Sequence, residues 1–394
     1  MKAIWFTLSF FALGCAEEET AKPEPVEEEE EEIGLAVLGS GTQDVSNVNF
    51  DRIGDDDDGL NTPRDLAFNP DVEGELWVVN RTDDSVTIFN GAGTEDQDSE
   101  HLVDPFAMHF MDEVSSIAFG AAVYDGSDAV NFATCQESKN DYNGQDPSGG
   151  NYFMGPTLWS SDRDIFAESF PDAVEYLSDL FGMYVDLGSH LDMLHESPLC
   201  MGIAHDYDNV YWVFDGYNES IYRYDFQEDH GPGYDDHGDG IMGRYVEGDV
   251  DYEADVPSHM VLDQESRLLY IADTGNNRIA VLDTESGEQG RNLMRAEAPH
   301  TEHFEVEGAE MWTLIDGDDF DMEAPSGLAL VDNVLFVTDN ETSEIIAFSV
   351  EGEELDRLDT ELDEGALMGI YATSIEELWI VDAEDDRVYR IQPD

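Results

Sequence analysis

Short apolar runs that end in an asparagine or aspartate recur along the chain. In each copy an aromatic residue lies three positions before that polar residue, a β-branched residue lies six positions after it, and another apolar residue follows three positions later. An apolar strand, a polar turn and a second strand are typical of a β-hairpin. Five copies share these offsets, at residues 76–80, 211–215, 269–273, 335–339 and 378–382.

A further apolar segment precedes each hairpin, at residues 63–68, 200–204, 257–262, 325–330 and 367–371. The wide gap between the first two copies holds a degenerate unit, with segments at residues 105–110, 114–119 and 130–134. Six units of this length predict the blades of a β-propeller. The aromatic position is the same in every copy, which favours packing between blades over ligand binding.

Residues 272–279 (ADTGNNRI) resemble the core of an NHL repeat, and the other copies resemble weaker versions of it. The resemblance implies an all-β fold, a six-bladed β-propeller over residues 46–394. The last unit ends after its third strand, three residues before the C-terminus. Residues 48–53 alternate between apolar and polar, so we predict that this N-terminal strand closes the last blade and removes a free sheet edge.

The first residues have the pattern of an export signal. The apolar stretch at residues 3–13 is shorter than the roughly 20 residues that span a bilayer, but it suits a secretory signal. Residues 12–15 (ALGC) resemble a bacterial lipobox, which implies that residues 1–14 are a lipoprotein signal peptide and that Cys15 is lipidated. An ordinary secretory signal cut nearby is the alternative. We expect residues 15–45, which begin with an acidic low-complexity tract, to form a disordered tether.

The charge excludes two classes of partner. The chain has 93 acidic and 16 basic residues, a formal net charge of −77. Nucleic-acid binding and direct docking on anionic lipid both depend on lysine and arginine. A hydrophobic fraction of 41% is nevertheless enough for a sizeable core. We therefore expect a folded monomer, exported and anchored to the bacterial outer membrane or cell surface through its lipid alone.

Two cysteines remain once Cys15 is lipidated. Cys135 ends the second strand of the degenerate unit, and Cys200 begins the inner segment of the next unit. An even number of cysteines in an exported protein favours a disulfide, here one that joins the ends of an insertion at residues 136–199; two separate buried thiols are the alternative. Apolar spacing at residues 171–185 predicts a helix over one face of the ring.

The inner segments of a propeller line its central channel, and most of their residues here are small or apolar. The exceptions are Arg64, Asp65, His109, His205 and His259. Arg64 and Asp65 are candidate ligand-binding residues, and the three histidines could converge on a zinc or copper ion. Such a site is similar to that of peptidylglycine amidating lyase, a six-bladed propeller with inner-strand histidines on a metal.

This chain departs from the lyase pattern. In the lyase each histidine directly follows a proline, whereas here Ser258 separates Pro257 from His259. His205 also lies one residue out of step with the other two histidines. We therefore assign no catalytic residue, and the alternative is that each histidine hydrogen-bonds to its own blade.

A second candidate metal site lies in the loop after the third unit. Asp235, His237 and Asp239 alternate before a glycine, as in the first half of a calcium-binding loop. The closing glutamate is missing, because Val246 occupies its position. We expect calcium ahead of zinc or copper as a cofactor, with a solvated insertion as the alternative.

No motif in the chain specifies an enzyme activity. We therefore favour a lipid-anchored scaffold at the bacterial envelope that binds a protein or a glycan. A metal-dependent hydrolase or lyase, with its histidine site at the central channel, is the alternative. The scaffold hypothesis predicts a large exposed apolar or aromatic patch.

Overall fold

The structure is a computed structural model that describes residues 34–139, 152–228, 230–294 and 301–394. The expected signal peptide, Cys15 and the acidic tract up to residue 33 lie outside the described residues. Within the described ranges, no helix is long and apolar enough to cross a membrane.

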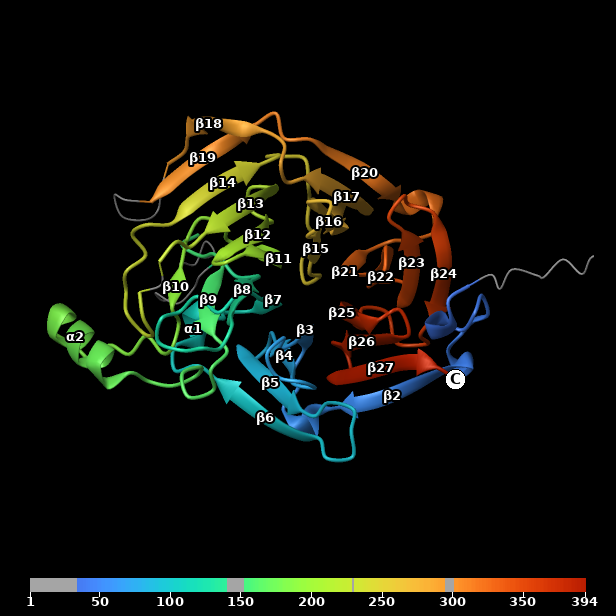
Figure 1. Ribbon diagram of the computed structural model, residues 1–394, viewed down its shortest axis with the longest axis horizontal. Helices are drawn as coiled ribbons and strands as arrows, with labels where there is room; N and C mark the ends of the chain where they lie inside the picture. Colours follow the sequence, from blue (N-terminus) through green and yellow to red (C-terminus); the bar gives the residue numbers. More distant parts are fainter. Residues whose placement is uncertain (1–33, 140–151, 229, 295–300) are drawn as a thin grey trace, which may run out of the picture. The chain divides into compact units, whose positions relative to one another are not determined.

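Six β-sheets are arranged around a central axis (Figure 1). Blade 1 consists of β3 (Pro63–Phe68), β4 (Leu76–Asn80), β5 (Ser85–Asn90) and β6 (Asp98–Val103). Blade 2 consists of β7 (Val114–Phe119), β8 (Asn131–Gln136), β9 (Thr157–Ser160) and β10 (Asp192–Met193). Blade 3 consists of β11 (Cys200–Tyr207), β12 (Val210–Asp215), β13 (Ser220–Asp225) and β14 (Ile241–Tyr245).

The other three blades complete the ring. Blade 4 consists of β15 (Met260–Asp263), β16 (Leu268–Asp273), β17 (Arg278–Asp283) and β20 (Met311–Asp316). The hairpin of β18 (Glu288–Asn292) and β19 (Glu302–Glu307) leaves blade 4 and extends the sheet of blade 3 through β14. Blade 5 consists of β21 (Pro325–Val331), β22 (Val334–Asp339), β23 (Glu344–Ser349) and β24 (Glu354–Asp359). Blade 6 contains β25 (Leu367–Ser374), β26 (Glu377–Asp382) and β27 (Arg387–Pro393).

The recurring aspartates explain why the hairpins form. Asp215, Asp339 and Asp382 each end the second strand of a blade, and each accepts hydrogen bonds from the amides two and three residues later. Such side-chain bonds stabilise a tight turn before the third strand. The repeated acid is therefore part of the turn in each of these blades.

The recurring aromatic residues pack between blades, as the repeat predicts. Trp77 of blade 1 contacts the rings of Phe119 and Phe132 in blade 2. Trp379 of blade 6 contacts Phe68 of blade 1. Both tryptophans are buried, so these side chains stabilise the contacts between neighbouring blades.

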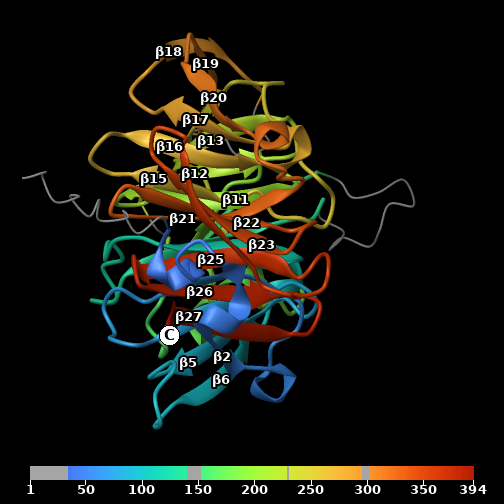
Figure 2. The same ribbon diagram turned by 90° about the vertical axis from the view of Figure 1, so that its right-hand side faces the viewer.

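The predicted ring closure is confirmed. The outermost strand of blade 6 is β2 (Val48–Gly54), which is antiparallel to β27 from the other end of the chain (Figure 2). The folded part begins before residue 46, where we expected the propeller to start. Val37 and Leu38 are fully buried in the core beside blade 6, and β1 (Gln43–Asp44) pairs with β24 of blade 5. The residues that directly follow the acidic tract therefore belong to the folded core.

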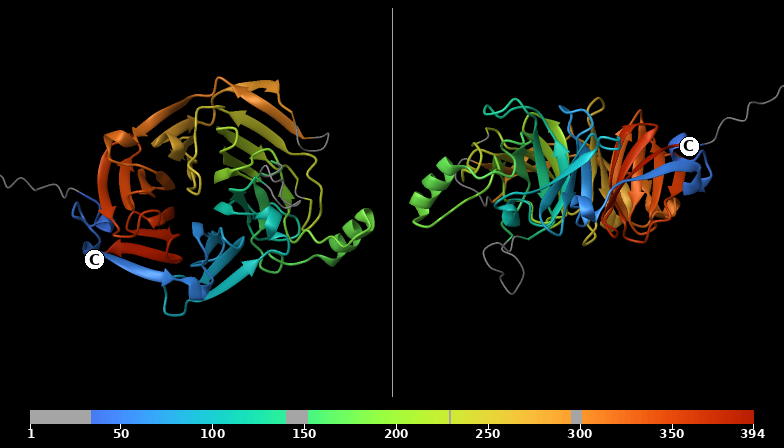
Figure 3. Two further views of the ribbon diagram at one scale, coloured as in Figure 1. Left: turned by 180° about the vertical axis from the view of Figure 1, so that it is seen from behind. Right: turned by 90° about the horizontal axis from the view of Figure 1, so that it is seen from below.

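The region of the insertion differs from expectation in three respects. Residues 105–110 form no strand; they contain the short helix α1 (Ala107–Phe110). The outer strands β9 and β10 of blade 2 come from within residues 136–199. The expected helix is present as α2 (Pro171–Phe181), which starts with a proline and ends before the left-handed Gly182. It extends outward from the ring (Figures 1 and 3) rather than over one face.

The predicted disulfide between Cys135 and Cys200 is confirmed. It joins β8 of blade 2 to the first residue of β11 in blade 3, and it closes a loop with a sequence separation of 65 residues. In a chain-entropy model, a disulfide that closes a loop of this length stabilises the folded protein by about 4 kcal/mol. The bond thus fixes both ends of the segment that carries β9, α2 and β10.

Candidate functional site

The innermost strands of all six blades surround a cavity of about 480 Å³ at one end of the central channel. Most of its lining is apolar, and its charged or titratable side chains include those of Asp65, His205 and His259. The structure therefore brings three of the sequence-predicted residues to the channel.

The polar groups of Asp65 and His259 are occupied by contacts within the propeller. Both carboxylate oxygens of Asp65 accept backbone amides, from Leu66 at 2.8 Å and from Ile117 at 3.0 Å. Nδ1 of His259 lies 3.7 Å from Oδ1 of Asp65, and its Nε2 lies 3.1 Å from the carbonyl oxygen of Ser115. Burial raises the pKa of Asp65, and the nearby His259 opposes that rise.

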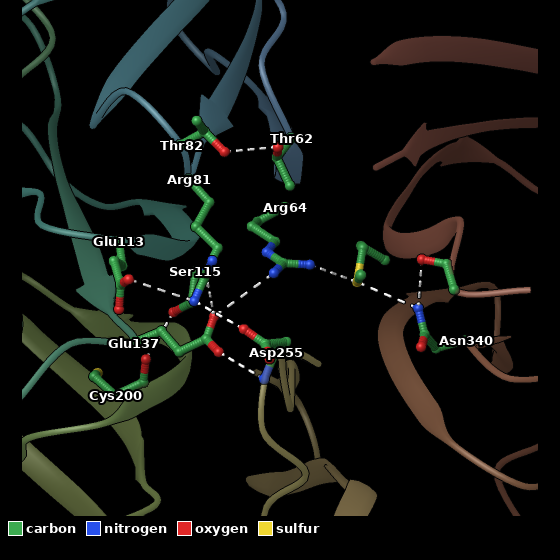
Figure 4. A network of polar contacts seen from close by, with 12 residues as sticks. Thr62, Arg64, Arg81, Thr82, Glu113, Ser115, Glu137, Cys200, Asp255 and Asn340 are labelled. Carbon is green, nitrogen blue, oxygen red and sulfur yellow. Dashed lines mark hydrogen bonds and ion pairs between the residues drawn. The ribbon is translucent and has the colours of Figure 1, made fainter. Parts of the chain in front are cut away.

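Arg64 points to a different environment from that of Asp65. Its Nη2 lies 4.0 Å from Oε2 of Glu137, and its Nη1 contacts Sδ of Met368 (Figure 4). Nε of Arg81 donates to the same Glu137 oxygen at 3.1 Å. The amide of Asp255 donates to the other Glu137 oxygen at 2.8 Å. Glu137 therefore balances the charge of Arg64.

His109 does not lie with the other two candidate metal ligands. It belongs to α1 and not to the innermost strand of blade 2, which is β7. Its Nε2 lies 3.3 Å from Nε2 of His195, and the two rings are stacked. Nε2 of His205, at the channel, lies 3.1 Å from the carbonyl oxygen of Asp208. The expected convergence of His109, His205 and His259 is absent from the described residues.

A larger cavity, of about 750 Å³, lies beside α1 at the outer part of blade 2. Aromatic and aliphatic side chains form most of its wall, together with three histidines and two aspartates. The lining residues include Phe106, Phe110, Phe153, Phe181, Met183 and Tyr184, with His109, His195, His237, Asp186 and Asp235. An apolar pocket with a few grouped polar side chains is typical of a binding site.

The helix α2 adds an exposed apolar surface at the opening of this cavity. Ala173 and Leu177 are its buried side chains and hold it to the protein. Five large apolar side chains nearby are exposed: Tyr176, Leu180, Phe181, Met183 and Tyr184. We call these five residues the α2 patch. The exposed fraction reaches 73% at Tyr184 and 67% at Met183.

The α2 patch is interspersed with acid. Asp172, Glu175 and Asp179 of α2 are exposed. A protein with few basic residues thus presents apolar and negatively charged side chains together. The complement of this surface is apolar and positively charged.

Of the three predicted loop residues, Asp235 and His237 line the same cavity, whereas Asp239 is not among its lining residues. Nε2 of His237 lies 3.3 Å from Asp235, and its Nδ1 lies 3.0 Å from Oδ1 of Asp192. Asp239 lies 3.2 Å from Nε2 of His230. Asp192 is fully buried, and burial raises its pKa to about 6 while its contact with His237 opposes the rise.

Sequence reasoning did not single out His190, Asp192, His195 or His230 as ligands, although His230 belongs to the candidate loop at residues 229–240. Three of them form a short pattern in the insertion, His190-Leu191-Asp192-Met193-Leu194-His195, which is the only local signal for them. Burial lowers the pKa of both His190 and His195 well below the usual histidine value. These imidazoles are therefore neutral near pH 7.

No family model matches the chain, and no curated protein is similar to it in sequence. The NHL resemblance therefore stays a prediction. Among solved structures, an auxiliary nutrient binding protein from Bacteroides ovatus has 12% identity and a TM-score of 0.50, over 88% of this chain and 77% of that chain. A putative phosphatase from Bacteroides thetaiotaomicron has 11% identity and a TM-score of 0.52, over 85% and 71%. Virginiamycin B lyase from Staphylococcus aureus has 12% identity and a TM-score of 0.44, over 88% and 98%.

The chain is a six-bladed β-propeller. The nutrient binding protein and the putative phosphatase carry names that describe unlike functions, and at these identities the similarity extends to the fold alone.

Proposed function

We propose that this protein is a lipid-anchored binding protein of the bacterial envelope that captures a partner protein through the α2 patch and the cavity beside it. The single observation that carries the proposal is the exposure of five large apolar side chains on and just after one helix. The buried side chains Ala173 and Leu177 already attach that helix to the protein. Exposed apolar groups that do not hold the fold mark an interaction surface.

The charge of the protein defines the chemistry of the partner. The net charge of −77 and the acidic residues among the α2 patch favour a segment with apolar and basic side chains. Tyr184 and Phe181 could also stack on sugar rings, but Leu180 and Met183 offer no hydrogen bonds to a glycan. A protein segment therefore fits this surface better than an oligosaccharide does.

The predicted export signal supports a place at the cell surface. Lipidation at Cys15 and an extended acidic tether would hold the propeller away from the membrane. The alternative of a metal-dependent hydrolase or lyase has less support. Nε2 of His205 and of His259 each face a backbone carbonyl, and His109 lies elsewhere.

The experiment compares three forms of the full chain in detergent. One carries Leu180→Ser, Met183→Ser and Tyr184→Ser. A control carries Met294→Ser and Trp312→Ser, which remove exposed apolar side chains outside the α2 patch. The probes are a fluorescent peptide of leucine, phenylalanine and lysine, the same peptide with glutamate for lysine, and cell-wall oligosaccharides.

We expect the basic peptide to bind to the wild type and the control, and to bind at least tenfold more weakly to the triple variant. We also expect added salt to weaken this binding, because the Debye length falls to about 3 Å at 1 M salt. Equal binding by all three forms would contradict the proposal. Binding of the oligosaccharides alone would replace the protein partner with a glycan.

A further inference from the structure

We propose that Asp192, His230 and Asp239 bind one divalent transition-metal ion of the zinc class. Asp192 lies on β10 of blade 2, and the other two residues lie on the connection between β13 and β14 of blade 3. One potential ligand atom from each residue lies within 4.8 Å of the other two.

The spacing of these atoms fits a tetrahedral ion. Nε2 of His230 lies 3.8 Å from Oδ2 of Asp192 and 3.2 Å from Oδ1 of Asp239. Zinc bonds of about 2.0–2.2 Å in tetrahedral geometry separate neighbouring ligands by about 3.4 Å. Both observed distances are within a few tenths of an ångström of that value, so small side-chain rotations would complete the site.

A buried carboxylate oxygen points independently to a cation. Asp192 is fully buried, and its Oδ1 accepts the amide of Met193 at 2.7 Å and lies 3.0 Å from Nδ1 of His237. Its Oδ2 has no hydrogen-bond partner among the described residues and faces His230. A buried polar atom without a partner is costly, and coordination of a cation would satisfy this one.

The donor set favours zinc over calcium. Calcium takes six to eight oxygen ligands, whereas one imidazole and two carboxylates suit zinc with water in the fourth position. The two carboxylates would also neutralise the charge of the ion. We had expected calcium at Asp235, His237 and Asp239; of these three residues, only Asp239 belongs to the proposed ligand set.

The ion would join two parts of the chain, β10 and the loop between β13 and β14. The loop that carries His230 and Asp239 also packs against α2. The ring of Tyr234 in this loop is 5.9 Å from the ring of Tyr176 in α2. The amide of Gly233 donates to the carbonyl of His190 at 2.9 Å. The metal site consists of its own ligand atoms, and it does not depend on whether α2 binds a partner.

The test measures zinc on the full chain, extracted in mild detergent and purified without chelator. The protein is dialysed against micromolar free zinc, and bound metal is counted by mass spectrometry of the elements. The test variants are His230→Ala and Asp239→Asn, which change partly exposed side chains and should fold. His101→Ala is the matched control, since His101 is a half-exposed histidine that pairs with Asp83 in blade 1.

We expect one zinc per chain in the wild type and in His101→Ala, and little zinc in the two test variants. His237→Ala, which removes the contact that orients Asp192, should weaken zinc binding roughly 10- to 100-fold. The proposal is overturned if the wild type binds no zinc, or if His230→Ala binds as much as the wild type. Calcium bound equally by the wild type and His230→Ala, with no zinc, would also overturn it.

Discussion

Phe50, early in the folded chain, lies opposite Ile391, near its end, across the pairing of β2 and β27. The ring of Phe50 is 4.6 Å from that of Tyr389 on the same strand as Ile391. The two ends of the folded chain thus form one blade, and opening the ring requires β2 and β27 to separate.

The first prediction concerns this closure. Phe50→Ala should lower the free energy of unfolding by about 1–2 kcal/mol, because it removes a half-buried ring that packs against Tyr389. Val72→Ala, at an exposed position, should change it by less than about 0.5 kcal/mol. Denaturant unfolding of both variants measures the difference. An unchanged midpoint for Phe50→Ala would show that the closure contributes little.

The second prediction concerns the buried charge of Glu137. Glu137→Ala should lower the free energy of unfolding by about 3–5 kcal/mol, because Arg64 would remain buried without its counter-charge. Glu113→Ala removes a more exposed carboxylate that pairs with Arg81 and should cost less than about 1 kcal/mol. The comparison is made by urea unfolding. Equal losses in the two variants would contradict the assignment of Glu137 as the balancing charge.

The third prediction concerns pH. Burial raises the pKa of Asp215 from the ordinary 3.8 to about 7, although its hydrogen bonds from Asn218 and Tyr217 oppose the rise. Between pH 3.8 and about pH 7, Asp215 holds a proton in the folded protein that it has lost in the unfolded chain. The contribution of this protonation to stability is therefore complete below about pH 4 and falls by roughly 1.4 kcal/mol per pH unit until about pH 7.

Asp215→Asn should remove this part of the pH dependence. Its side-chain oxygen can keep the amide bonds from Tyr217 and Asn218, and its amide carries no titrating proton. The measurement is thermal unfolding at pH 5, 6 and 7 in high salt, which screens the general charge repulsion. Between pH 5 and pH 7 the unfolding temperature should fall less steeply for the variant than for the wild type. Parallel pH curves would show that Asp215 keeps an ordinary pKa in the folded protein.

The sequence pattern was enough to predict the six blades, the closing strand and the disulfide. The blades follow from offsets within a repeat: an aspartate that accepts hydrogen bonds in the turn, as Asp339 does, and an aromatic residue that packs on the next blade, as Trp77 does. The closing strand follows from the missing fourth strand of the last unit, and the disulfide follows from the even number of cysteines that remain in an exported chain. Such local rules act wherever the repeat is intact. They failed at His109, where a short apolar run has the same pattern in a strand and in the one-turn helix α1.

The candidate sites depend on contacts that local spacing does not contain. Asp192 and His230 come from different blades, and their approach depends on how the insertion folds back beside the loop after β13. The exposure of Leu180 and Tyr184 also depends on where α2 projects, because the spacing that predicted the helix did not indicate which face would remain free.

The most direct measurement for the central claim is site-specific photo-cross-linking in intact cells of the producing organism. A benzophenone amino acid replaces Tyr184 in the α2 patch or, as the control, Trp312 on β20. We predict that position 184 yields one protein adduct, joined through a segment with apolar and basic residues, and that position 312 does not. The same adducts from both positions, or none from position 184, would contradict the claim that the α2 patch captures a partner protein.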